Sequence, residues 1–368
     1  MTRATTVYDV AAAAGVSTAT VSRYFRSPDK LSPAALTAVQ AAVERLGYLP
    51  SGMARGLAER RTGAVGLYSF SGHEADELLM PEAGDADTVT VVRDDAGATR
   101  PRLFPLFADE VLRGVELECT LRRLPLVVGW QPREEGGIAL DEIARRVDGL
   151  VVLPSTLPDA QLKQLARAKA IVVVSQPAPG GVDVGAVLVN NEGGMRALAG
   201  HLADVHDVRE FWFAGPQEGF EHEARRRGFD EALRERGLVE VPPTIVETGS
   251  RVDARAAVGR ALARCRPPRA IVCASDQTGL GVMEALADAG YRVPDDVIVT
   301  GFDGIDAGRF MLPGLTTVRQ PMELLGRVAL QLLAERLDDA GAPTRTVTLP
   351  VEVVLRGSCG CGVSPAPR

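Results

Sequence analysis

Short polar side chains recur in residues 17–23, and their spacing suits hydrogen bonding to another molecule rather than bond-breaking chemistry. The segment is S-T-A-T-V-S-R and follows A-G-V at 14–16. Gly15 would turn the chain between two helices, and Ser17 would cap the second. The side chains left facing outward are Thr18, Ala19, Ser22 and Arg23. Such a face can enter the major groove of DNA, although an alanine-rich three-helix bundle that binds nothing would have the same core.

The five cysteines predict neither a disulfide framework nor a metal centre. Their number is odd, and they are spread from Cys119 to Cys361, unlike those of a disulfide-rich domain. Cys359 and Cys361 are separated by one glycine, but a metal site needs further ligands, and none lies nearby in the sequence. The four histidines form no pattern with the cysteines. We therefore expect no metal and no cofactor.

Motifs of catalytic and nucleotide-binding sites are also missing. The sequence has no G-x-S-x-G elbow, no Walker loop, no G-x-G-x-x-G after a strand-like run and no histidine-centred triad. An enzyme is therefore a disfavoured alternative. The sequence predicts a protein that binds other molecules without converting them.

Charge is distributed unevenly along the 368 residues. Residues 1–62 carry eight Lys and Arg against four Asp and Glu, whereas the whole chain has a net charge of −7. Residues 1–62 therefore have a net charge of +4 and the remainder one of −11. This distribution suits a polyanionic partner at the N-terminal end. No apolar run approaches the ~20 residues of a membrane span, and the N-terminus lacks the apolar core of a signal peptide. We expect a cytoplasmic protein without membrane contact.

Helix and strand signals divide the chain into an all-α head, a linker and an α/β body. Three short helices are expected in the head, at 6–14, 17–25 and 32–46. Residues 51–62 are polar, basic and glycine-containing, which is typical of a hinge. From residue 63 onward, short apolar runs alternate with amphipathic helices.

The apolar runs of the body predict parallel strands buried between helices. They lie at 64–68, 124–128, 149–153, 171–174, 211–214, 270–273 and 297–300. Helices are expected between most of them, for example at 108–123, 194–203 and 280–289. A body of about 300 residues exceeds one typical core, so we expect two doubly wound α/β lobes.

Residues 9–23 resemble the helix-turn-helix head of the LacI/GalR (lactose-repressor) family of transcriptional regulators, whose pattern is close to D-V-A-x-x-A-G-V-S-x-x-T-V-S-R. The match continues to L-G-Y-L-P at 46–50. The resemblance implies a homodimer bound to double-stranded DNA at a pseudo-palindromic operator. The residues expected to contact bases are Thr18, Ala19 and Arg23. Those expected to contact phosphates are Ser17, Thr20, Ser22 and Arg26.

Residues 51–57 resemble the hinge of that family, N-x-x-A-R-x-L, which forms a short helix on the minor groove. Ala54, Arg55 and Leu57 match, and Leu57 would be the apolar wedge at a central base step. Ser51 replaces the usual Asn, and the two glycines each weaken helix propensity by about 1 kcal/mol relative to Ala. We expect this hinge to fold only on DNA, with a plain flexible linker as the alternative.

The body resembles the family over nearly all of residues 63–358. The matching segments are F-P-L-F at 104–107, R-R-R-G-F at 225–229, S-D at 275–276, V-P-D-D-V at 293–297, G-F-D at 301–303 and L-T-T-V-R-Q-P at 315–321. The implied fold has two periplasmic-binding-protein-like lobes, joined by three crossovers, with a ligand between them beyond the carboxyl ends of the strands.

This resemblance also implies domain boundaries. The helix-turn-helix domain would span 1–50, the hinge 51–62, and the effector-binding and dimerisation domain 63–368. Within the last, lobe 1 would comprise about 63–188 and 320–342, and lobe 2 about 190–318 and 345–358.

The resemblance implies a small polar effector, a sugar or sugar-like metabolite. Asp276 would accept hydrogen bonds from ligand hydroxyls, and Arg225 would donate from the opposite side. The other expected contacts are Phe107, Asn190 and Ser250. A helix N-cap is the alternative role for Asp276, and a solvated helix charge is the alternative for Arg225.

Departures from the family pattern bear on the ligand. Asn190 stands where the family usually has Asp, and Ser250 falls about where an aromatic side chain stacks on a sugar, with Arg251 beside it. An acidic stretch at 71–101, with a run at 88–92 that could be a strand, is expected to be a surface loop rather than a lid. These departures favour an anionic or amide-bearing ligand, or none.

We expect a repressor controlled by a small polar ligand. A regulator with a degenerate pocket that senses no small molecule is one alternative. A solute-binding protein is another, and the complete head and the missing signal peptide argue against it.

Overall fold

The computed structural model of the chain divides into two compact units, Met1–Gly63 and Ala64–Arg368. It describes residues 5–48, 61–70, 89, 91, 106–131, 138–153, 157–216, 218–238, 245 and 249–361. Most of the expected hinge and of the 71–101 stretch lies outside the described residues. Val89 and Val91 are described, and neither belongs to a strand.

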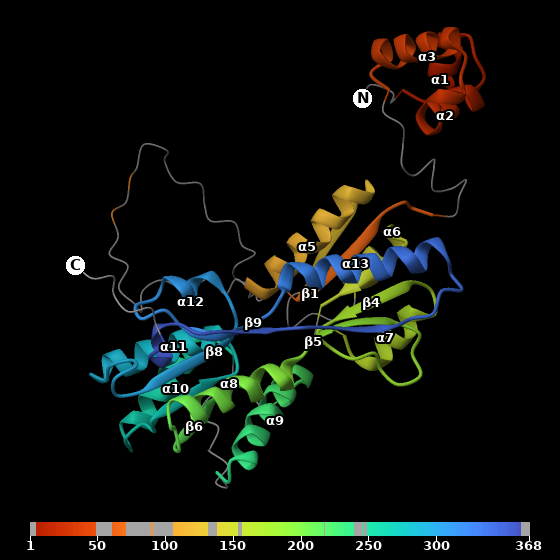
Figure 1. The fold of residues 1–368 in the computed structure, drawn as a ribbon. Helices are drawn as coiled ribbons and strands as arrows, with labels where there is room; N and C mark the ends of the chain where they lie inside the picture. The colour runs from red at the N-terminus through yellow and green to blue at the C-terminus, as the bar shows by residue number, and fades with distance from the viewer. Residues whose placement is uncertain are drawn as a thin grey trace. The chain divides into compact units, whose positions relative to one another are not determined.

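The described residues of the first unit form three helices and a 3₁₀ turn: α1 (Val7–Ala14), α2 (Thr18–Arg26), η1 (Pro28–Lys30) and α3 (Pro33–Leu46) (Figure 1). Each α-helix begins at a hydroxyl, since Thr6, Ser17 and Ser32 accept hydrogen bonds from backbone N–H groups three residues later. Helices α1 and α3 end at Gly15 and Gly47, whose φ angles of 67° and 58° are left-handed and favour glycine.

Small apolar side chains form the core of this unit. Val10, Val21 and Val39 are fully buried, one from each helix. They are joined by nearly buried Ala11 and Ala42, whose methyl groups let the helices approach closely. The three expected helices are confirmed, with ends that differ by one residue.

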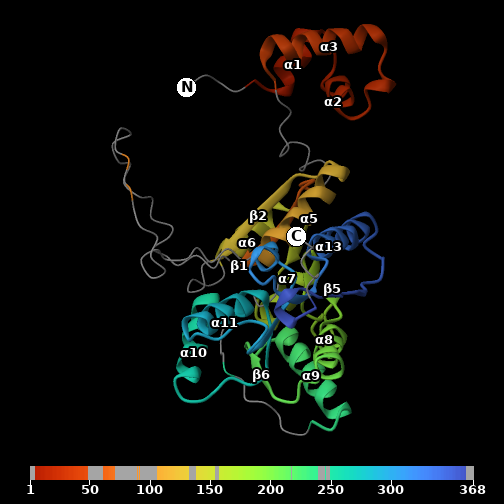
Figure 2. The same cartoon turned by 60° about the vertical axis from the view of Figure 1, so that its left-hand side comes forward.

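The first lobe of the second unit is a parallel sheet of six strands: β1 (Val65–Phe70), β2 (Leu126–Gln131), β3 (Gly149–Val152), β4 (Ala170–Val174), β5 (Gly185–Val189) and β10 (Thr346–Leu349). Their spatial order is β10-β5-β4-β3-β1-β2. Helices pack on one face as the pair α5 (Leu106–Arg122) and α13 (Met322–Asp338), and on the other as α6 (Ile138–Arg146) and α7 (Asp159–Ala166) (Figure 2). Two covered faces explain continuous apolar strands such as A-I-V-V-V in β4.

The second lobe repeats this plan with five strands: β6 (Phe211–Ala214), β7 (Ala270–Cys273), β8 (Ile298–Asp303), β9 (Thr316–Arg319) and β11 (Glu352–Val354). Their order is β11-β9-β8-β7-β6, and β11 alone runs antiparallel to its neighbour. The helices form two pairs: α8 (Asn191–Val205) with α9 (Phe220–Glu235), and α10 (Arg251–Leu262) with α11 (Asp276–Asp288). Two short elements complete the lobe: α12 (Asp306–Phe310) and η3 (Gly357–Cys359).

The chain passes between the lobes three times, after β5, after β9 and after β10. The last passage differs from the expected boundary, which placed all of 345–358 in lobe 2. Thr346–Leu349 instead pairs with β5 of the first sheet, Val347 opposite Val187. The sequence did not predict β10 because an edge strand with exposed threonines lacks the continuous apolar run of a buried strand.

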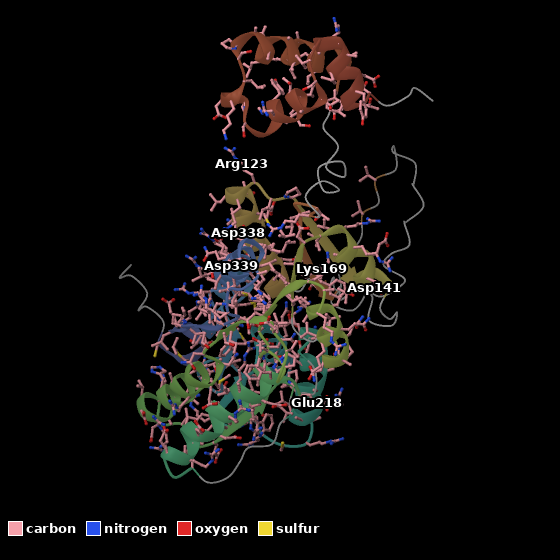
Figure 3. All side chains as sticks on the ribbon, turned by 90° about the vertical axis from the view of Figure 1, so that its right-hand side faces the viewer. Arg123, Asp141, Lys169, Glu218, Asp338 and Asp339 are labelled. Atoms are coloured by element: carbon pink, nitrogen blue, oxygen red, sulfur yellow. The ribbon has the colours of Figure 1, made fainter. Side chains whose placement is uncertain are left out.

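Apolar contacts also join the two lobes directly. Leu280 of α11 and Ile305 before α12 are buried in the same cluster as Ala108 and Met322 of the first lobe. Charged side chains such as those of Asp141, Glu218 and Asp338 lie exposed on the outside (Figure 3). The lobes therefore meet through a partly apolar interface, whereas these charged side chains face solvent.

Helix pairs in the second lobe approach so closely that only glycine fits at the contact. A Cβ atom on Gly281 of α11 would lie 2.1 Å from the backbone oxygen of Arg251 at the start of α10. Real Cβ atoms do not come this close to a carbonyl, so any side chain would push the helices apart.

We expect Gly281→Ala to lower the free energy of unfolding of the second unit by about 1–3 kcal/mol through overpacking. Gly259→Ala in α10 is the matched control, since a Cβ there meets nothing within 4 Å, and alanine should stabilise the helix by up to about 1 kcal/mol. Differential scanning calorimetry of both variants tests this. Equal melting temperatures would contradict the close contact.

Candidate DNA-binding surface and polar cluster between the lobes

Helix α2 combines a buried face with a small exposed one. Val21 is fully buried, and Tyr24 and Phe25 pack partly against the same core. The exposed side chains are those of Ala19, Ser22 and Arg23. Positions i, i+3 and i+4 lie on one side of a helix, so these three form a narrow strip of the kind that a DNA groove accommodates.

The N-terminus of α2 is fixed by two hydroxyls. Ser17 Oγ accepts a hydrogen bond from the backbone N–H of Thr20 at 3.1 Å and lies 3.0 Å from the Thr20 hydroxyl. Ser17 is exposed, whereas Thr18 and Thr20 are half-buried. The first turn carries no acidic residue, so the positive end of the helix dipole is available to a phosphate.

The remaining residues expected to contact DNA lie wholly or partly outside the described residues. Arg26 is the last residue of α2, but its side chain lies outside the described part of the chain. The same holds for the whole of Ala54, Arg55 and Leu57 in the expected hinge.

A buried guanidinium organises the polar residues of the body. Arg225 of α9 is 3% exposed, which rules out the solvated helix charge considered from the sequence. Its Nε donates to Asn191 Oδ1 at 2.8 Å, and its Nη1 donates to the carbonyl oxygen of Ala274 at 2.7 Å. The guanidinium carbon also lies 3.9 Å from the ring centroid of Phe302, within cation–π range.

Two carboxyl groups flank this guanidinium. Arg225 Nη1 lies 3.4 Å from Asp303 Oδ1, and Arg225 Nη2 lies 3.6 Å from Glu221 Oε1. Burial raises the pKa of both carboxyls, and the charge of Arg225 opposes that rise. With both acids ionised around one cation, the cluster would carry excess negative charge. A raised pKa means that a carboxyl is more easily protonated, which removes this excess.

Several buried atoms at this cluster make no close hydrogen bond in the described part of the chain, even though Glu221 Oε1 lies in the ion pair with Arg225. They are Ser175 Oγ, Glu221 Oε1, His222 Nδ1 and Gln320 Oε1. Ser175 follows β4 in the first lobe and lies near enough to Glu221 to lower the pKa of that carboxyl. Gln320 lies on the second passage between the lobes and donates from Nε2 to Asp303 Oδ1 at 2.7 Å. The cluster therefore draws residues from both lobes and from a connection between them.

Asp276 is fully buried, and its carboxylate is engaged by the protein itself. Oδ2 accepts from the backbone N–H groups of Gly304 and Ile305, each at 2.8 Å, and Oδ1 accepts from the Thr317 hydroxyl at 2.6 Å. Burial and the charge of Asp303 raise its pKa to about 7. The N-cap alternative is wrong, since Ser275 caps α11.

The other expected ligand contacts have partners other than Arg225. Asn190 and Ser250 cap α8 and α10, accepting from the N–H groups of Gly193 and Asp253 at 3.0 Å each. Phe107 packs partly against the core of the first lobe. Arg251, which favoured an anionic ligand, instead forms an ion pair with Glu284 of α11.

Three residues of the cluster, Asn191, Glu221 and Asp303, were not predicted from the sequence. Asn191 adjoins the expected Asn190, and Glu221 lies one helical turn before Arg225. The i, i+4 spacing from Glu221 to Arg225 was a usable signal. Asp303 closes the G-F-D segment, but its proximity to Arg225 depends on the fold of the whole lobe.

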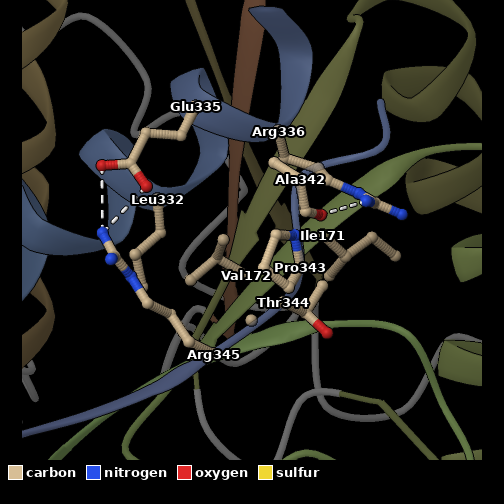
Figure 4. Close-up of a pocket in the computed structure, with 10 residues that line it drawn as sticks. Ile171, Val172, Leu332, Glu335, Arg336, Ala342, Pro343, Thr344 and Arg345 are labelled. Atoms are coloured by element: carbon tan, nitrogen blue, oxygen red, sulfur yellow. Dashed lines mark hydrogen bonds and ion pairs between the residues drawn. The ribbon is translucent and has the colours of Figure 1, made fainter. Parts of the chain in front are cut away.

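A shallow pocket elsewhere does not suit an effector. It lies between α13, the segment before β10 and the amino ends of β4 and β5, and its walls include Ile171, Leu332 and Pro343 (Figure 4). The Arg345–Glu335 ion pair lies across it. Ligands of open α/β sheets bind beyond the carboxyl ends of the strands, and this pocket lies at the opposite edge.

Within the described residues, no helix is both long and apolar enough to cross a membrane.

Family models match both parts of the chain. Residues 6–51 match the bacterial regulatory proteins of the lacI family, and residues 199–359 match the periplasmic binding protein-like domain.

Relatives resemble the chain over almost its full length. The HTH-type transcriptional regulator CelR of Thermobifida fusca is 32% identical over 359 residues, which cover 96% of each protein. The structure of a CelR–cellobiose complex is similar with a TM-score of 0.64 at 28% identity, covering 96% of this chain and 99% of that one. The lac repressor dimer bound to operator and the anti-inducer ONPF has the same fold, with a TM-score of 0.78 at 22% identity and coverage of 97% and 99%.

A capped helix-turn-helix, two parallel α/β lobes and these relatives lead to one assignment. The chain belongs to the LacI family of bacterial transcriptional regulators, and it is a DNA-binding regulator with a periplasmic-binding-protein-like effector domain, not an enzyme.

Proposed function

We propose that the protein is a repressor whose binding to a pseudo-palindromic operator is controlled by a neutral, hydroxyl-rich molecule at the polar cluster between the lobes. The observation that carries this proposal is the set of buried acceptor atoms without partners in the described residues. Leaving a buried polar atom unpaired costs about 1–3 kcal/mol. A ligand with several hydroxyl donors would remove that cost on binding.

The charges of the cluster support a neutral ligand. Glu221 and Asp303 already outnumber the single guanidinium of Arg225, so an anion would add repulsion. Hydroxyl groups can donate to Glu221 Oε1 and Gln320 Oε1, and Arg225 Nη2 can donate back to a ligand oxygen. The cellobiose in the CelR complex belongs to the same hydroxyl-rich class. A neutral ligand is therefore preferred to the anionic one that the sequence favoured.

Coupling to DNA would follow from the origin of the contacts. Ser175 comes from the first lobe, Glu221 from the second, and Gln320 from the connection between them. A ligand that contacts all three would favour one relative orientation of the lobes, and that preference is the free energy available for regulation. Asp276 would act indirectly, by holding Gly304 and Ile305 in place behind Asp303.

On the DNA side, we propose a homodimer, as in the lac repressor dimer bound to operator. Residues 1–50 would place α2 in the major groove, with Arg26 at a phosphate. Residues 51–62 would contact the minor groove through Ala54, Arg55 and Leu57. Residues 63–368 would dimerise and bind the effector. The protein would act in the cytoplasm, where its DNA lies.

A second candidate is a regulator whose pocket no longer senses a small molecule. The three donors to Asp276 and the four polar partners of Arg225 favour it, because both residues are satisfied by the protein alone. The two candidates differ in one result, which is whether any neutral polyol stabilises the body.

Arg23→Ala should weaken operator binding by about 1–3 kcal/mol while changing binding to random DNA little, because a base contact carries the sequence information. Lys30→Ala, an exposed basic residue outside α2, is the matched control and should weaken both DNAs alike. Fluorescence anisotropy at fixed salt measures the four affinities. Equal losses for Arg23→Ala on both DNAs would contradict base recognition.

Glu221→Gln should weaken effector binding by roughly 10- to 100-fold, since a hydrogen bond to a charged group is worth about 1.5–3 kcal/mol, and should leave operator binding intact in the absence of effector. Glu223→Gln, an exposed position on the same helix, should bind effector normally. Thermal shift with neutral sugars, sugar acids and sugar phosphates identifies the ligand class, and calorimetry then gives the affinities. Stabilisation by acids alone would contradict a neutral ligand.

The pH dependence of stability should show a contribution from His222. Burial and Arg225 lower the pKa of His222 to about 4 from the usual 6.5. The unfolded chain therefore binds more protons between these values, and stability is lost as pH falls from about 6.5 to 4. His222→Gln removes this loss, so its melting temperature should rise relative to wild type as pH falls through that window. A difference that stays constant from pH 7 to 4 would contradict this.

A further inference from the structure

Two histidines and two cysteines meet on the second lobe, away from the polar cluster. His201 belongs to the last turns of α8, and His206 is the C-cap of that helix. Cys359 ends η3, and Cys361 follows it. One ligand atom from each side chain lies within 4.8 Å of every other. No further ligand lies near the cysteines in the sequence, but the fold brings two histidines to them from about 155 positions away.

The ligand atoms lie close enough together for a small shift to place them around one metal ion. His206 Nε2 lies 3.1 Å from Cys361 Sγ, and His201 Nε2 lies 3.4 Å from the same sulfur. In a tetrahedral zinc site, with Zn–S of about 2.3 Å and Zn–N of about 2.0–2.1 Å, nitrogen and sulfur ligands are separated by about 3.5 Å. The two imidazole rings meet edge to face, with centroids 5.1 Å apart.

The backbone holds the two sulfurs on one side of the chain. Gly360 between them has a φ of 94°, a left-handed conformation that strains other residues, and its N–H donates to Gly357 O at 3.0 Å. Just before it, the Ser358 hydroxyl is buried, donating to Val299 O at 2.6 Å and accepting from Thr316 N at 2.8 Å. The cysteine segment is therefore anchored to β8 and β9 rather than lying loosely on the surface.

The surroundings are those of a closed structural site. Cys359 is 1% exposed and lies in the apolar cluster of the second lobe, against which Cys361 packs in part. The four side chains fill all positions of a tetrahedral ion, and two thiolates with two neutral imidazoles neutralise a divalent cation. Catalytic sites instead keep a position open for water or substrate.

We propose that His201, His206, Cys359 and Cys361 bind one Zn²⁺ ion as a structural Cys₂His₂ site. On binding, the aqueous ion loses its coordinated waters and the two thiols lose their protons to solvent, while two Zn–S and two Zn–N bonds form. The ion ties the end of the second lobe to the C-terminus of α8. Because it closes a loop of about 155 residues, it should stabilise the body independently of effector and DNA.

The test uses the full-length protein. Elemental analysis of protein purified from zinc-supplemented cells without chelator should find one zinc per chain. After removal of zinc with a chelator, added Co²⁺ should produce an intense tetrahedral d–d absorption with a thiolate charge-transfer band, which the zinc protein lacks. Added Zn²⁺ should then raise the melting temperature. Absence of zinc, together with no cobalt spectrum, would overturn the proposal, as would stoichiometric iron or copper in place of zinc.

Variants assign the ligands. Cys361→Ser and His206→Gln should each weaken zinc affinity by at least about 100-fold, more than the 10- to 100-fold typical of residues that only support a ligand. Cys265→Ser, at an exposed cysteine outside the cluster, is the matched control and should bind zinc as wild type does. Circular dichroism verifies that each variant is folded. Full zinc content in Cys361→Ser, or a Cys359–Cys361 disulfide in metal-free protein prepared under reducing conditions, would overturn the assignment.

Discussion

The second lobe depends on keeping one buried positive charge satisfied. Arg225 is removed from water, and a charge in that position is tolerated only where hydrogen bonds and opposite charges surround it. Its partners come from the start of α8, the end of β7 and the end of β8, as well as from its own helix. The guanidinium thereby fixes the edge of the sheet at which the effector is proposed to bind, and a shift of any of these segments would disturb the others.

A second buried charge supports the first. Asp276 holds the turn at Gly304 and Ile305 directly after Asp303, and it also holds Thr317 on the neighbouring strand. Gly301 makes this possible, since a Cβ there would lie 2.1 Å from Asp276 Oδ1. Asp276 therefore acts on Arg225 indirectly. It positions the end of β8, and Asp303 at that end faces Arg225. A ligand that changes the balance of charge around Arg225 would be felt along this chain of contacts.

Local signals in the sequence were sufficient for the head and for most of the sheets. Ser17, Ser32 and Gly47 act through neighbours three or four residues away, so their roles as caps could be predicted. The β10 and β11 strands were missed because they lie at sheet edges with exposed residues, and β9, T-T-V-R, lacks a continuous apolar run. The β5 run G-A-V-L-V is as long as the run of β4 and could have been predicted. The partners of the site residues could not be predicted, for a different reason. Asp276 is satisfied by residues 28 to 41 positions away, and no pattern within one segment reports that.

The three passages between the lobes have a consequence for synthesis of the protein. The head is one continuous segment and can fold as soon as it leaves the ribosome. Neither lobe is continuous, because β10 at the edge of the first sheet and β11 at the edge of the second are both made after residue 345. Neither sheet can therefore be completed until these C-terminal strands have been synthesised. A chain cut short before β10 would carry a finished DNA-binding head on two sheets with unpaired edges, and such edges favour aggregation.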